Sequence, residues 1–172
     1  MPLPVVGKAH EAKAQTEFVW FIYGSSLSKR AFAAWAQEHG YQLPDFSAAF
    51  PARLDGYRLA FDVMSRFWGG ATADLVPAPG SAVEGIALPL PGSARGLVDH
   101  KEGAISGLYE PFEVQVKPLA GGAPSAAIAY RAAASRRLTE EAPPSETFLE
   151  TLLEGAREWK LSEGWIGSLA AR

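Results

Sequence analysis

Cysteine is absent from the 172-residue chain, and histidine occurs only as His10, His39 and His100. Without cysteine the chain forms no disulfide and offers no thiolate to zinc, to an iron–sulfur cluster or to nucleophilic catalysis. No two histidines stand four residues apart, so the sequence predicts no imidazole metal cage. Any chemistry is therefore expected from carboxylates, hydroxyls, lysines or backbone amides.

The chain also lacks an excess of charge of one sign and a long apolar run. Sixteen lysines and arginines stand against 19 acidic residues, which gives a net charge of −3 at pH 7. This balance gives no reason to expect nucleic acid or an anionic membrane as a partner. No apolar run approaches about 18 residues, and the N-terminus carries no secretion signal. We therefore expect no membrane span and a cytoplasmic location.

Residues 1–16 differ in character from residues 17–172. The first segment is broken by Pro2 and Pro4 and is then polar, so we expect a flexible N-terminal arm. Hydrophobic residues make up 48% of the chain, enough for a core in one domain over residues 17–172. The sequence leaves open whether two copies form a homodimer.

The domain begins with the pattern of a buried strand, a tight turn and a helix. Residues 18–23 are a continuous run of strand-forming apolar residues, as expected for a strand that is buried on both faces. A helix is predicted over Lys29–Glu38, with Ser26 or Ser28 as its N-cap and Gly40 just beyond its end.

The middle of the chain favours strands, and its end favours a helix. An apolar stripe with helical spacing from Phe148 to Trp159 predicts a helix that Ser145 caps. Strands are expected at residues 50–63, 71–76, 83–88, 109–116 and 126–134. This order predicts a mixed α+β domain built around a curled sheet.

The glycine–serine turn at residues 24–26 is the first candidate for chemistry. A strand that ends in such a turn before a helix leaves backbone N–H groups unpaired, and these groups bind an anion such as a carboxylate or a phosphate. The alternative is a simple connection in which a serine caps the helix. No glycine-rich nucleotide motif is present, so a nucleotide is not implied.

The polar segment at residues 99–103 is the second candidate. If Glu102 ends a short helical turn, the helix dipole and partial burial both raise the pKa of its carboxyl group. Such a carboxylate exchanges protons near neutral pH; the alternative is a solvated polar face. Tyr109 is expected to pack with its hydroxyl group reaching water, or to hydrogen-bond a substrate or the Glu102 carboxylate. Trp68 is expected to anchor the core, with the lip of a pocket as the alternative.

Several of these segments, taken in chain order, resemble the gamma-glutamylcyclotransferase (AIG2-like) family. Residues 21–27, FIYGSSL, are similar to the Tyr-Gly-Ser-Asn-Leu substrate loop of that family. Residues 99–109, DHKEGAISGLY, are similar to its catalytic-glutamate segment. Further similarity is found at residues 52–54, 68–72, 79–85 and 148–165.

The resemblance implies a small mixed β-barrel with flanking helices and an enzyme that needs neither metal nor cofactor. Its substrate would be a small-molecule γ-glutamyl amide, whose own α-amine attacks the γ-carbonyl and releases 5-oxoproline and a free amine, with Glu102 as general acid/base. The resemblance implies substrate contacts from Tyr23, Gly24, Ser25, Ser26, Leu27 and Tyr109. Ser26 stands where the family usually has asparagine and Phe148 where it often has tyrosine, so the leaving amine is undetermined.

Two other functions remain open from the sequence. A small-ligand-binding or interaction module would keep the barrel without the reaction, and the departures at Ser26 and Phe148 favour it slightly. Retention of Glu102 together with residues 23–25 argues against it. A γ-glutamyl amide hydrolase would use the same carboxylate to activate water, and would release glutamate in place of 5-oxoproline.

Overall fold

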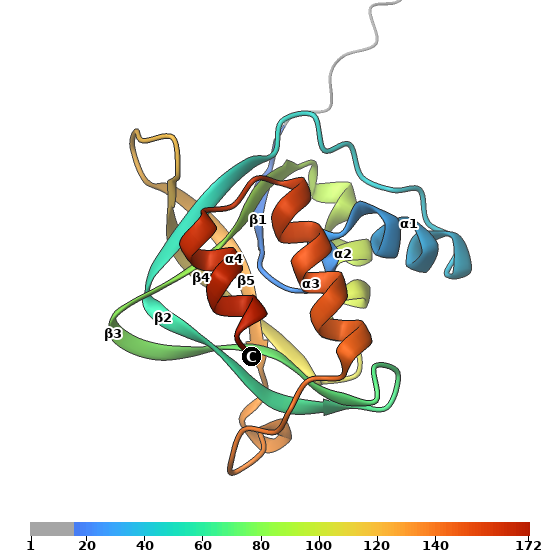
Figure 1. Ribbon diagram of the computed structural model, residues 1–172. Coiled ribbons are helices and arrows are strands. Elements are labelled where there is room, and N and C mark those ends of the chain that lie inside the picture. Colours follow the sequence, from blue (N-terminus) through green and yellow to red (C-terminus); the bar gives the residue numbers. More distant parts are fainter. Residues whose placement is uncertain (1–15) are drawn as a thin grey trace, which may run out of the picture.

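Five strands form a closed barrel in the order β1-β3-β2-β4-β5, and helices pack around it (Figure 1). The computed structural model describes residues 16–172, so the arm expected over residues 1–16 lies, except for its last residue, outside the described part. The elements are β1 (Phe18–Ile22), α1 (Lys29–Glu38), β2 (Phe50–Ser65), β3 (Gly70–Leu90), α2 (Arg95–Lys101), β4 (Tyr109–Pro118), β5 (Ser125–Ala132), α3 (Glu146–Glu158) and α4 (Glu163–Ala170). The expected α+β barrel with flanking helices is confirmed.

Strand β1 lies between two other strands of the barrel. It pairs antiparallel with β3 and parallel with β5, and residues 20–22 are each at most 1% exposed. This confirms the strand buried on both faces. Ser28 is the N-cap of α1 and accepts a hydrogen bond from the Ala31 N–H at 3.1 Å. Gly40, just past the helix, has a φ of 75°, which favours glycine.

Strands β2 and β3 form a long hairpin. The sequence predicted two strands in the place of β3, residues 71–76 and 83–88, and this is wrong because β3 continues through the prolines between them. Residues 78–81 bulge opposite the single residue Gly56. The bulge takes Pro79, which has no N–H donor, out of the ladder, so the strand bends without ending.

Strand β5 forms although its many alanines favour a helix. Ala127, Ala129 and Ala132 are at most 5% exposed. The strand pairs along its whole length with β4 and also touches β1. Pairing and burial in the barrel override the weak local preference of alanine, as is common in sheets.

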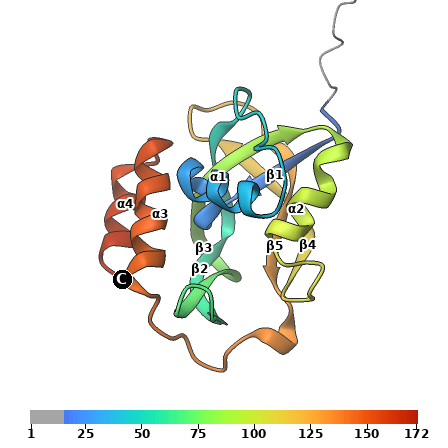
Figure 2. The ribbon, with the colours of Figure 1, turned by 90° about the vertical axis from the view of Figure 1, so that its right-hand side faces the viewer.

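The helices lie on different sides of the barrel: α3 and α4 cover one side, and α2 lies on the other (Figure 2). Ser145 and Ser162 cap α3 and α4 by accepting hydrogen bonds from the N–H groups of Phe148 and Trp165, each at 3.1 Å. Within residues 16–172 no helix is long and apolar enough to pass through a bilayer.

Helix α3 packs directly on the turn that follows β1. Gly155 permits this approach, because a Cβ at that position would lie 2.5 Å from the Leu27 Cβ and 2.7 Å from the Ser28 nitrogen. Trp159 Nε1 donates a hydrogen bond to the Leu27 carbonyl at 3.0 Å. The position of the turn therefore depends on the missing side chain at Gly155.

Gly155→Ala is expected to lower the free energy of unfolding by about 2 kcal/mol, because the added methyl group meets backbone atoms. In an unstrained helix the same change usually stabilises a protein by up to about 1 kcal/mol. Gly167→Ala in α4 is the matched control, since a Cβ there meets nothing within 4 Å. Urea unfolding of both variants measures the difference, and equal stabilities would contradict the packing argument.

Candidate active site

A cavity of about 190 Å³ opens between the turn after β1, the end of α2 and the start of β4. Seven residues were predicted from the sequence to act in catalysis or substrate binding, and six of them line this cavity: Tyr23, Gly24, Ser25, Ser26, Glu102 and Tyr109. Segments about 80 residues apart in the sequence thus meet in one hollow, with residues of β3 between them. Within residues 16–172 no group of three potential metal-ligating side chains is found.

Leu27, the seventh predicted residue, does not line the cavity. Its side chain is 1% exposed and packs in the core against α3. The expected substrate contact from this residue is therefore not supported by its position. The apolar residue of the turn faces the core because burial of a leucine side chain is favourable by about 1.5–3 kcal/mol.

Glu102 directly follows α2 and is its C-cap, with its N–H donating to the Val98 carbonyl at 2.9 Å. Gly103 then ends the helix with a φ of 72°. Burial raises the pKa of Glu102 to about 7, and the neighbouring ammonium of Lys101 opposes this rise. Within residues 16–172 no hydrogen bond to the Glu102 carboxylate offsets its desolvation. The predicted helix end and raised pKa are both present, with burial as the main cause.

Residues of the turn after β1 line the same cavity. Its own hydrogen bonds run from Leu27 N to Gly24 O and from Ser28 N to Ser25 O, both at 3.1 Å. These bonds are accepted by carbonyl groups of the turn, and neither of them involves the N–H groups of residues 24–26. A Cβ at Gly24 would meet nothing within 4 Å, so a ligand can approach the backbone here.

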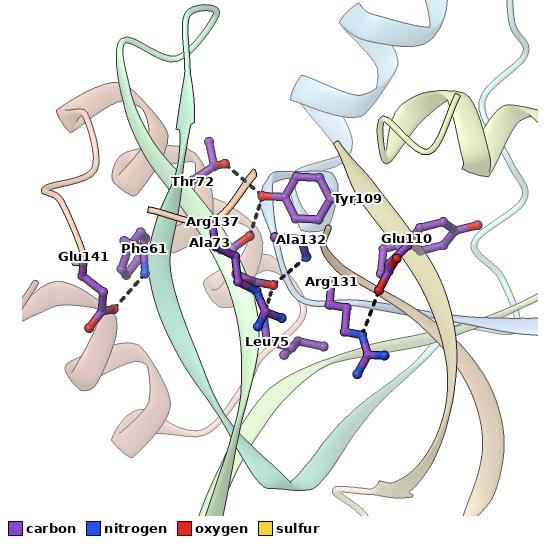
Figure 3. Close-up of polar contacts among 12 residues, drawn as sticks. Phe61, Thr72, Ala73, Leu75, Tyr109, Glu110, Arg131, Ala132, Arg137 and Glu141 are labelled. Atoms are coloured by element: carbon purple, nitrogen blue, oxygen red, sulfur yellow. Dashed lines mark hydrogen bonds and ion pairs between the residues drawn. The ribbon is translucent and has the colours of Figure 1, made fainter. Parts of the chain in front are cut away.

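Tyr23 and Tyr109 line the cavity while their hydroxyl groups are held by the barrel. The Tyr23 hydroxyl donates to the Tyr130 carbonyl at 2.5 Å. The Tyr109 hydroxyl donates to the Ala73 carbonyl at 2.7 Å and lies 3.0 Å from Thr72 Oγ1 (Figure 3). Burial raises the pKa of both tyrosines. Both therefore stay neutral and shape the cavity, with their protons committed to carbonyl groups.

Trp68 and Phe148 form the part of the wall that lies toward α3. Both line the cavity, and their ring centroids are 5.2 Å apart. Trp68 therefore packs in the core and also forms a lip of the pocket, so both interpretations made from the sequence apply. Phe148 and Ser26, the two departures from the family pattern, are 2% and 4% exposed and both border the cavity.

The sequence analysis gave no individual role to several residues that line the cavity: Ser65, Thr72, His100, Lys101 and Leu108. A signal existed for Lys101. It stands four residues after Leu97 and three after Val98, so a short helix places it on the same face as these apolar residues. No such local signal existed for Ser65 or Thr72, which reach the cavity only through the pairing of β2 with β3.

Known proteins share this sequence pattern and fold. The model of the AIG2-like family matches residues 82–169. Gamma-glutamylcyclotransferase of Bos taurus is 31% identical over 149 residues, or 82% of this chain and 71% of that protein; its Homo sapiens counterpart is 30% identical over 150 residues, or 84% and 72%. A solved structure of a gamma-glutamyl cyclotransferase has a TM-score of 0.74 at 26% identity, covering 90% of this chain and 86% of that one. This chain therefore belongs to the AIG2-like, gamma-glutamylcyclotransferase family.

Proposed function

We propose that the protein converts γ-glutamyl amides into 5-oxoproline and a free amine. Membership of the family makes it an enzyme of the gamma-glutamylcyclotransferase kind. The observation that carries the proposal for the site is Glu102. Its carboxyl group has a pKa of about 7, and Glu102 lines the same small cavity as residues 24–26.

The reaction needs one carboxylate and no second substrate. The α-nitrogen of the glutamyl group bonds to the γ-carbonyl carbon, and the bond from that carbon to the amide nitrogen breaks. The α-ammonium group first loses one proton to solvent, because only the free amine attacks; a second proton leaves the same nitrogen as the ring closes, and one must reach the departing nitrogen. Glu102 takes this second proton as general base and delivers it as general acid, a role commonly worth ~10²–10⁴-fold in rate.

The turn at residues 24–26 supplies hydrogen-bond donors, which an ionised carboxylate cannot provide. Its N–H groups suit either the α-carboxylate of the glutamyl group or the γ-carbonyl oxygen, which becomes negative as the ring closes. Either contact folds the substrate so that its amine meets its own carbonyl, and such positioning is worth about 7–11 kcal/mol.

The size of the cavity indicates how much of the substrate it holds. Its volume of about 190 Å³ is below the ~300–1,000 Å³ that is typical for a complete drug-sized ligand. It therefore suits a glutamyl group, with the leaving amine outside it.

Glu102→Gln is expected to abolish turnover while the fold persists, because the amide keeps the shape of the side chain but cannot exchange a proton. A panel of γ-glutamyl amides, with detection of 5-oxoproline by mass spectrometry, measures the effect. Glu113→Gln, on an exposed position of β4, is the matched control and should leave activity intact. Full activity of Glu102→Gln would remove this residue from the mechanism. Release of glutamate in place of 5-oxoproline would indicate a hydrolase.

Activity and stability should respond to pH in opposite directions. Since the general base must be ionised, kcat/KM should rise with pH around the Glu102 pKa of about 7. This folded-state pKa exceeds the usual 4.5, so the folded protein binds more protons than the unfolded chain between these values and loses stability as pH rises through them. Glu102→Gln should therefore raise Tm at pH 8 and leave it unchanged at pH 4. A Tm difference independent of pH would argue against burial as the cause.

Ser26→Asn is expected to increase kcat/KM severalfold on simple γ-glutamyl dipeptides. Ser26 borders the cavity, and asparagine adds an amide group that can donate a hydrogen bond to the substrate. Steady-state assays of both proteins on the same dipeptide measure the change. Identical values would show that the backbone of the turn alone determines binding at this position.

A further inference from the structure

A second hollow adjoins the cavity and offers room for the leaving amine. It is a groove of about 510 Å³ between α1, the β2–β3 hairpin and the start of α3. The groove and the cavity share four lining residues: Ser25, Ser65, Trp68 and Lys101. A substrate whose glutamyl group fills the cavity therefore extends past these residues into the groove.

Lys101 places a positive charge at this junction. Its Nζ lies 5.4 Å from the centroid of the Trp35 ring and 5.8 Å from that of Phe32, and no carboxylate within residues 16–172 forms an ion pair with it. Burial lowers its pKa. By contrast Arg30, also on the groove, is bound at two nitrogens by Glu154. The ammonium of Lys101 is thus held by aromatic rings and left available to an anion.

Lys101 is adjacent in the chain to the residue with the proposed acid/base role. It directly precedes Glu102, whose proposed role is to protonate the departing nitrogen. When the leaving group is an α-amino acid, its carboxylate is attached to the carbon next to that nitrogen. An ammonium beside the general acid is therefore well placed for this carboxylate. The adjoining wall of the groove, formed by α1, includes the apolar residues Ala31, Ala34 and Trp35 between the charged residues Arg30 and Glu38.

We propose that the groove is the leaving-group subsite, in which Lys101 binds the α-carboxylate of a departing amino acid and the wall of α1 receives its side chain. This inference rests on the proposed cyclisation. It makes γ-glutamyl derivatives of neutral α-amino acids better substrates than γ-glutamylamines, which lack the carboxylate. Lys101 is then a specificity-determining residue, distinct from the general acid/base.

The experiment compares γ-glutamylalanine with γ-glutamylethylamide, which differ only by the carboxylate. The wild-type protein should prefer γ-glutamylalanine by tenfold or more in kcat/KM, the size expected for one hydrogen bond to a charged group. Lys101→Met should reduce this preference to threefold or less. Because the ratio is measured, any common loss from a changed Glu102 pKa cancels. Lys29→Met is the control: Lys29 also lies over an aromatic ring, 4.6 Å from the Trp159 centroid, but outside both hollows.

A second variant tests the groove without touching Lys101. Ala34→Trp, on the exposed surface of α1, should reduce the kcat/KM ratio of γ-glutamylleucine to γ-glutamylglycine at least fivefold, because the indole occupies the space for the larger side chain. Ala33→Trp, a neighbouring exposed position that does not line the groove, is its control.

The outcomes separate this inference from the proposed function. Release of 5-oxoproline with no preference for the carboxylate, or with a preference that Lys101→Met leaves unchanged, overturns the assignment of Lys101 alone. An unchanged ratio in Ala34→Trp overturns the assignment of the groove. Absence of 5-oxoproline from every γ-glutamyl substrate overturns the cyclisation and this inference together.

Discussion

The desolvation of one carboxylate is the constraint on which this site depends. Glu102 lies in a cavity where burial raises its pKa to about 7, and a buried charge without hydrogen bonds is costly for a folded protein. The end of α2 can hold it there because Leu97 and Val98 anchor the helix in the core. Stability from the rest of the fold thus offsets the cost of burying this carboxyl group.

A chain of hydrogen bonds connects the two halves of the site. The Tyr23 hydroxyl, at the end of β1, donates to the Tyr130 carbonyl at 2.5 Å. The Tyr130 hydroxyl in turn donates to Asp99 Oδ1 at 2.5 Å, and Arg95 pairs with the same oxygen at 3.2 Å. Asp99 and Arg95 belong to α2, the helix that ends at Glu102. The turn and the carboxylate are therefore held in one geometry through β5.

The packing of α1 and α3 determines the shape and the charge of the groove beside the cavity. Gly155 lets α3 approach the turn closely, and Arg30 of α1 forms an ion pair with Glu154 of α3. The same ion pair neutralises Arg30, which leaves Lys101 as the free cation among the described residues of the groove. Helices that stabilise the turn therefore also shape the space beside it and its charge.

The sequence by itself determined the features that local chemistry controls. Three features were predictable because each depends on neighbours in the chain: the burial of β1, the serine cap of α1 and the end of a short helix at Glu102. Only the tertiary structure decided that β3 runs unbroken, that Leu27 faces the core and that Lys101 joins two hollows. These features depend on strand pairing and on the close approach of α3 and α1, which bring together residues far apart in the sequence, and no local pattern encodes such contacts.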